Sequence, residues 1–160
     1  MIEARGLTKV YGEKTAVAGV NFTVEAGRVT GFLGPNGAGK STTMRMIMGL
    51  DRPTSGTVSV NGVPFDRHHA PLRDVGALLD AKAVHTSRSA YNHLLAMAAT
   101  HSIPKKRVHE VIEMTGLADV AKKKVGGFSL GMGQRLGIAA ALLGDPQTVI
   151  LDEPVNGLDP

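Results

Sequence analysis

The sequence predicts an α/β protein with a mixed sheet, on three observations. Apolar and polar residues alternate over Ile2–Val10 and Thr15–Glu25, as in two antiparallel strands joined by a turn. A short apolar stretch, Arg28–Leu33, then leads into a glycine-rich loop and a helix-like pattern. Near the end, a helix-like pattern precedes the apolar stretch Thr148–Leu151. Strands that alternate with helices indicate a parallel core sheet beside the antiparallel one.

The remaining elements of the first half follow from local signals. Apolar residues fall on one face of a helix expected over Lys40–Gly49. Pro53–Gly56 is then expected to form a turn, and Thr57–Val60 a strand. The dipeptide Asn61-Gly62 is a strong signal for a two-residue hairpin turn, because both residues tolerate a positive φ.

The second half is predicted to be mostly helical between two strands. Val75–Leu79 is an apolar strand candidate, and Ser89–Val125 shows helical periodicity with a helix start at Pro104. A further helix is expected over Met132–Leu143, ended by a glycine and a proline.

Composition narrows the class of protein. The chain has 160 residues, which is the size of one domain, and 42% hydrophobic with 20% charged residues indicates a folded globular protein. It has no cysteine, which excludes a disulfide scaffold and a thiolate metal site and is consistent with a reducing cytoplasm. No secretory signal is recognisable and no apolar run approaches the length of a spanning helix, so a membrane role is expected to be peripheral.

The net charge of +4 includes two basic clusters, Lys105–Arg107 and Lys122–Lys124. Solvated helix ends would explain them, and so would contact with nucleic acid or anionic lipid. No nucleic-acid-binding module or aromatic platform accompanies them, so we expect no nucleic-acid partner. None of the six histidines has metal-ligand spacing, and we expect them to be surface or helix residues.

A phosphate-binding loop is the strongest motif in the chain. The pattern G-x-x-x-x-G-K-[ST] is matched, between a predicted strand and a predicted helix, by Gly34, Pro35, Asn36, Gly37, Ala38, Gly39, Lys40 and Ser41. Glycines allow backbone N–H groups to approach phosphate oxygens, and the start of a helix favours an anion. Lys40 would contact the β- and γ-phosphates and Ser41 would bind Mg²⁺. We assign Thr42, the next residue, to the nucleotide contacts as well.

Two carboxylates end the last predicted strand, at Asp152 and Glu153. The carboxyl ends of strands are where α/β sheets bind ligands. Asp152 can join the Mg²⁺ shell, and Glu153 can polarise a water for attack on the γ-phosphate. The alternative is that both are ordinary surface acids at a strand end. The phosphate loop in the same chain disfavours this alternative.

The chain resembles the ABC ATPase family. The segment Phe128–Arg135 is similar to the family signature, usually L-S-G-G-Q, and lies one helix before the acidic strand. The segment Asn156–Pro160 resembles the loop that follows that strand in the family, the D-loop. The covered motifs extend over the whole chain and follow the family order.

The resemblance implies a nucleotide-sandwich dimer with ATP and Mg²⁺ as ligands. Tyr11 would stack on adenine, although a core ring beside a turn is the alternative. Ser129 and Gly131 would contact the γ-phosphate of ATP bound by the other subunit, and Ser129 can at the same time cap its helix. Asp80 stands where the family usually has a glutamine, and we assign it to the metal site.

Departures from the family pattern qualify these expectations. Leu130 and Met132 replace the usual glycine and glutamine of the signature, so Met132 offers no amide. No histidine follows Glu153, whereas the family has a switch histidine that contacts the γ-phosphate. We therefore expect a chain truncated after the D-loop that binds nucleotide better than it hydrolyses it.

By this resemblance the fold is a P-loop NTPase core with an N-terminal antiparallel β subdomain and an inserted α-helical subdomain. Residues 1–80 and 144–160 would form the β subdomain and core, and about 81–143 the helical subdomain with the signature. The expected function is the ATPase subunit of a membrane transporter, similar to bacterial exporters of drug- or peptide-resistance type. Its expected partners are a second ATP-binding subunit and a separate transmembrane permease, and its place is the cytoplasmic face of the cell membrane. A translation factor or repair ATPase, or an inactive nucleotide-binding module, are the alternatives.

Overall fold

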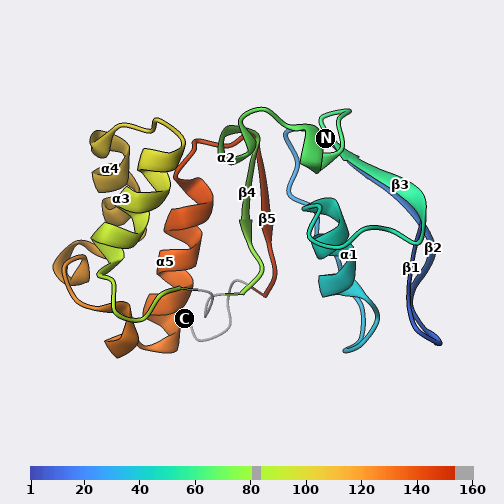
Figure 1. Cartoon of the computed structure of the whole chain (residues 1–160), viewed down its shortest axis with the longest axis horizontal. Helices are drawn as coiled ribbons and strands as arrows, with labels where there is room; N and C mark the ends of the chain where they lie inside the picture. Colours follow the sequence, from blue (N-terminus) through green and yellow to red (C-terminus); the bar gives the residue numbers. More distant parts are fainter. Residues whose placement is uncertain (81–83, 154–160) are drawn as a thin grey trace. The chain divides into compact units, whose positions relative to one another are not determined.

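The computed structural model describes residues 1–80 and 84–153 (Figure 1). The chain divides into two compact units, Met1–His69 and Ala70–Pro160. The predicted D-loop, Asn156–Pro160, lies outside the described residues. Each unit has its own sheet.

The first unit contains a three-stranded antiparallel sheet. Its strands are β1 (Ile2–Tyr11), β2 (Lys14–Val24) and β3 (Ser55–Val60), in the order β2-β1-β3. The alternating patterns correctly predicted β1 and β2, and the third strand begins two residues earlier than expected.

Helix α1 (Lys40–Ile47) packs on this sheet and confirms the helix predicted after the glycine-rich loop. Its Met46 is buried against Leu7 of β1 and Val17 of β2. At the end of β3, Asn61 and Gly62 have φ of 52° and 82°, so both lie in the left-handed region that the turn requires. The turn returns only as far as a single bridge between Val60 and Val63, and the one-turn helix η1 (Phe65–Arg67) follows.

The strand expected over Arg28–Leu33 is absent, and that prediction was wrong. The segment has no regular secondary structure, and Val29 and Leu33 are 105% and 93% exposed. A strand exists only where a neighbouring strand accepts and donates its backbone hydrogen bonds. The three strands of this unit pair with one another, and none of them pairs with this segment.

The second unit is built on two parallel strands, β4 (Val75–Leu78) and β5 (Thr148–Leu151), as predicted for the core sheet. They are in register from Val75 opposite Thr148 to Leu78 opposite Leu151. A short helix, α2 (Pro71–Asp74), leads into β4.

Helix α5 (Leu130–Leu142) lies against β4 at a close approach. A Cβ on Gly76 of β4 would collide with the carbonyl oxygen of Ala141, and one on Gly137 of α5 would collide with the side chain of Leu78. Small residues at both positions therefore set the distance between this helix and the sheet.

Two further helices, α3 (Ala90–Thr100) and α4 (Lys105–Met114), cover the other side of α5 (Figure 1). The one-turn helices η2 (Ala118–Val120) and η3 (Val125–Gly127) lead from α4 to α5. Leu94, Val108 and Leu136, one from each long helix, are fully buried in the core between them. Among the helices of residues 1–80 and 84–153, none has the length and apolarity that crossing a bilayer requires.

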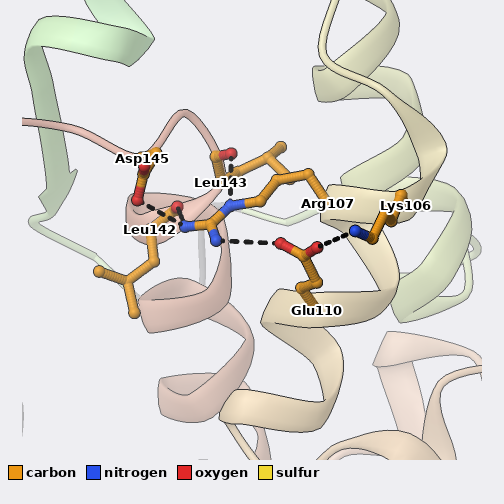
Figure 2. Close-up of polar contacts among 6 residues, drawn as sticks. All are labelled: Lys106, Arg107, Glu110, Leu142, Leu143 and Asp145. Carbon is orange, nitrogen blue, oxygen red and sulfur yellow. Dashed lines mark hydrogen bonds and ion pairs between the residues drawn. The ribbon is translucent and has the colours of Figure 1, made fainter.

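Arg107 of α4 holds the carboxyl end of α5 (Figure 2). Its guanidinium donates to the carbonyl oxygens of Leu142 at 2.9 Å and Leu143 at 3.4 Å. It also pairs with Glu110 at 3.2 Å and with Asp145 at 3.1 Å. A cation at the end of a helix satisfies carbonyls that have no partner within the helix. This residue of a basic cluster thus has an internal structural role.

Candidate functional site

The glycine-rich loop in the first unit has the backbone of a phosphate cradle. Gly37 and Gly39 have φ of 82° and 84°, in the region that glycine adopts without strain. A Cβ on Gly39 would also collide with the carbonyl oxygen of Ala16. Within the loop the Ala38 N–H donates to the Pro35 carbonyl at 3.1 Å, which closes a tight turn.

Helix α1 begins directly after this loop without a side-chain cap. Gly39 is the residue before the helix, no side chain accepts a hydrogen bond there, and no acidic residue lies in the first turn. The helix start therefore presents backbone N–H groups and a positive dipole end, with no acidic side chain in its own first turn. Such an end favours an anion, and it fits the phosphate groups of a nucleotide.

Lys40 brings a positive charge to the same loop. Its ammonium donates to the Gly34 carbonyl at 2.7 Å and to the Pro35 carbonyl at 3.0 Å. Ser41 and Thr42 follow in the first turn of α1, Ser41 exposed and Thr42 half-buried. The predicted loop residues thus lie together in the first unit.

Tyr11, at the end of β1, is tied by its hydroxyl to a charged pair. The hydroxyl donates to Asp51 Oδ2 at 2.8 Å, and Arg45 Nε donates to the same oxygen at 2.7 Å. Two hydrogen bonds, the larger contribution from Arg45 and the smaller from Tyr11, lower the pKa of Asp51 to about 2. Tyr11 as a residue is 46% exposed, which disfavours the alternative of a buried core ring.

Sequence reasoning missed Arg45 and Asp51. They stand at the end of α1 and just beyond it, 40 residues from Tyr11 in the case of Asp51. A lone arginine and a lone aspartate six residues apart carry no motif. The ammonium of Lys9 also lies 4.9 Å from the centre of the Tyr11 ring, in reach of a cation–π contact.

The acidic residues lie in the second unit, at the carboxyl edge of the parallel strands. The Asp152 N–H donates to the Leu78 carbonyl at 2.8 Å and continues the pairing of β4 and β5 by one step. Asp80 follows β4 by two residues, so it belongs to the same edge as Asp152. Carboxylate oxygens at this edge are ligands that suit Mg²⁺.

Glu153 has an unusual backbone. Its φ of 47° is in the left-handed region, which is costly for a residue with a side chain. The side-chain amide of Gln134 in α5 donates to its carbonyl oxygen at 3.4 Å. Gln134 was not among the predicted site residues, because the sequence of a helix does not indicate a partner that lies 19 residues further along the chain.

The signature segment forms the start of α5. Ser129 is the cap of this helix, and its hydroxyl accepts a hydrogen bond from the Met132 N–H at 3.2 Å. Gly131 lies in the first turn, and Leu130 is 53% exposed. The capping role expected of Ser129 is confirmed, and its contact with a γ-phosphate stays a prediction.

A separate hollow of about 580 Å³ lies on the helical part of the second unit. It is lined by Tyr91, His109, Ile112, Glu113, Ala118, Asp119, Ala121 and Lys122. None of the predicted nucleotide residues lines it. Across residues 1–80 and 84–153, no group of three or more histidine, aspartate or glutamate side chains could by itself hold a metal.

Comparison with known proteins identifies the family. Residues 17–156 match the sequence profile described as "ABC transporter". Bacitracin transport ATP-binding protein BcrA of Bacillus licheniformis is 46% identical across the whole chain, and lantibiotic transport ATP-binding protein SrtF of Streptococcus pyogenes is 38% identical. The chain covers 53% and 69% of these two proteins, so it spans about half the length of the first relative. The chain belongs to the ABC transporter family.

Solved structures agree with this assignment. The dimeric bacterial ABC transporter cassette MJ0796 superimposes with a TM-score of 0.89 at 27% identity, over 99% of this chain and 76% of that one. A second structure of the same cassette, bound to ADP and Pi, gives a TM-score of 0.88. The fold is that of an ABC ATPase cassette.

Proposed function

We propose that this chain forms the ATP-binding and ATP-hydrolysing part of a subunit that energises an ABC-type membrane transporter. The observation that carries the proposal is the phosphate cradle. Its left-handed glycines, the uncapped start of α1 and the Lys40 ammonium form one anion site in the first unit. Backbone N–H groups and a lysine at a helix start are what a triphosphate needs.

The chain's own residues divide the work of hydrolysis. Lys40 places positive charge against the β- and γ-phosphates as negative charge moves between them. Glu153 accepts a proton from the attacking water, an effect typically worth about 10²–10⁴-fold in rate. Ser41, Asp152 and Asp80 provide oxygen atoms that would hold Mg²⁺, which neutralises phosphate charge when bound.

The transport assignment rests on the relatives. BcrA and SrtF are named as ATP-binding proteins of bacitracin and lantibiotic transport, and both match this chain over its full length. A peptide-like antibiotic is accordingly the class of cargo we propose. Neither relative is a translation factor or a repair ATPase, which favours transport over these alternatives.

Two partners follow from the proposal. A second copy would complete each nucleotide site, since the related cassette MJ0796 is dimeric. A separate transmembrane permease would carry the cargo, and a structure described as part of the ABC transporter complex cbiONQ also resembles this chain. The proposed place of the subunit is the cytoplasmic face of the membrane, where it would be held by the permease.

Replacement of Glu153 by glutamine tests the hydrolytic role. In the intact protein, Glu153→Gln removes the proton acceptor but keeps the shape of the side chain. We expect ATP turnover to fall by about 10²–10⁴-fold, while ATP binding persists and an ATP-bound dimer accumulates. Phosphate release and size-exclusion chromatography with ATP measure the two effects.

The matched control is Glu113→Gln, an exposed glutamate of α4 in the same unit. It makes the same chemical change away from the acidic strand end and should leave turnover unchanged. If Glu153→Gln turned over ATP as fast as the control, Glu153 would not be the base.

A further inference from the structure

Gln134 is the polar side chain that links α5 to the acidic strand end. It is 7% exposed, and of the described residues only it and Thr43 are buried polar ones. Its Nε2 donates to the Glu153 carbonyl oxygen at 3.4 Å. This contact joins the helix that carries the signature to the backbone of the proposed base.

The helix from which Gln134 reaches is held firmly against the strands. Gly137, three residues further on α5, leaves no room for a Cβ beside Leu78. Residues three apart lie on the same face of a helix, so Gln134 is on the side that faces the sheet. The same close approach recurs at Gly76 and Ala141, near the other end of α5. The position of Gln134 relative to β4 is therefore fixed by helix packing, independently of its hydrogen bond to Glu153.

The acceptor residue, Glu153, has a backbone conformation that depends on support from its surroundings. Glu153 has a φ of 47°, and a residue with a side chain keeps such a conformation only where its surroundings over-determine it. The direction in which the Glu153 carboxylate leaves the backbone depends on this φ. A hydrogen bond to the carbonyl of the same residue acts on that orientation directly.

The other side-chain atom of Gln134 argues against a purely stabilising role. Its Oε1 is buried and accepts no hydrogen bond from the described part of the chain. A buried polar atom without a partner lowers stability, and an apolar side chain of similar size would avoid that cost. A glutamine is thus the poorer choice for packing alone.

We propose that Gln134 is a positioning residue for the hydrolytic reaction: it fixes the backbone of Glu153 and so aims the carboxylate at the attacking water. The inference rests on the proposed role of Glu153 as base. It also gives a physical connection between the signature helix and the acidic strand end within one unit. Movement of α5 would reach Glu153 through this amide.

Gln134→Met in the intact protein tests the proposal, because methionine keeps the length and removes both polar atoms. We expect the kcat for ATP to fall about tenfold or more, since small misplacements of a catalytic group are costly. The dissociation constant for ATP should stay within about twofold of the native value, and the unfolding temperature should not fall. Gln147→Met, the same change at an exposed position in the same unit, is the control and should leave all three quantities unchanged.

The double variant Gln134→Met with Glu153→Gln separates positioning from a general effect on the fold. If Gln134 acts through Glu153, its replacement lowers turnover in the native background and not in the Glu153→Gln background. Equal losses in both backgrounds would overturn the proposal while the role of Glu153 stands. Full turnover of Glu153→Gln alone would overturn both.

Gln134→Leu provides a second variant in case the methionine packs badly. A kcat loss with native unfolding temperature in either variant supports positioning. If both variants unfold at the assay temperature, or lose stability and ATP binding together with turnover, Gln134 is a structural residue and the proposal fails.

Discussion

At the scale of single residues, the hydroxyl of Tyr11 links the end of β1 to the charged pair of Arg45 and Asp51. Its hydrogen bond to Asp51, with Arg45 on the same carboxylate oxygen, anchors the hydroxyl end of an exposed ring. A ring held in one orientation loses less entropy when a base stacks on it than a freely rotating one. The charged pair would therefore favour the stacking on adenine that we propose for Tyr11.

We predict that Tyr11→Ala weakens ATP binding by about 1–3 kcal/mol, because it removes the stacking surface. Tyr11→Phe keeps the ring and loses only the hydrogen bond to Asp51, so its loss should be about 1 kcal/mol or less. Titration calorimetry of ATP into the Glu153→Gln background measures both without turnover. Equal binding by the alanine variant and the parent would remove Tyr11 from the site.

The Asp51 carboxylate also has a defined pH range. Its pKa of about 2 in the folded chain is below the ordinary value of 3.8, chiefly because Arg45 donates to it. The contribution of this network to stability is thus complete above about pH 4 and is lost as the pH falls toward 2. Across the neutral range, ring orientation should not depend on pH through Asp51.

Some of these residue contacts follow from sequence and others do not. Gly39 and Lys40 belong to a motif whose spacing encodes its backbone geometry, so the cradle could be predicted from eight consecutive residues. Arg45, Asp51 and Gln134 act through partners that only the folded chain brings near. Gln134 lies inside the signature-like segment Phe128–Arg135, but neither that motif nor the sequence around Arg45 and Asp51 indicates which partner the side chain meets.

At the scale of elements, the contrast between local patterns and distant partners also explains the one strand that was wrongly predicted. Helix α1 needs only its own periodicity and its own backbone bonds, and its position was foreseen. A strand takes its hydrogen bonds from elsewhere in the chain, so the apolar run Arg28–Leu33 could indicate a strand without determining its partner. β4 and β5 were recognisable because each is short, apolar and bounded by clear breaks.

The next prediction concerns Arg107, whose side chain joins α4 to the end of α5 (Figure 2). Arg107→Met removes the side-chain donor of the Leu142 and Leu143 carbonyls, although the Leu142 carbonyl keeps the Asp145 N–H at 3.1 Å. We expect a loss of about 1–3 kcal/mol in the free energy of unfolding. Arg107→Lys should recover only part of this, since a point charge cannot reach four acceptors as a planar guanidinium does. Urea unfolding followed by circular dichroism gives the values.

The neighbouring Lys106 is the control for Arg107. It pairs with the same glutamate, Glu110, at 3.7 Å, but its side chain is 87% exposed. Exposed pairs contribute little, so Lys106→Met should change stability by less than about 0.5 kcal/mol. Similar losses in the Lys106 and Arg107 variants would mean that net charge, not the helix end, is responsible.

At the scale of the whole molecule, the proposed function requires two copies. The cradle at Lys40 lies in one unit and the signature at Ser129 in the other, and the proposed sandwich dimer would place them in sites shared between subunits. Each site then uses Lys40 from one copy and Ser129 from its partner. This arrangement makes a prediction that a site within one chain does not make.

Lys40→Ala and Ser129→Arg should each abolish ATP turnover as pure homodimers, because every site lacks one half. When the two variants are mixed and allowed to exchange subunits, a mixed dimer combines one doubly defective site with one intact site. Random exchange at equal amounts should restore turnover to roughly a quarter of the native value, since half of the dimers are mixed and each has one intact site. Phosphate release before and after mixing measures this recovery. If each site were formed within a single chain, every site in the mixture would still lack Lys40 or carry Arg at 129, and mixing would restore nothing.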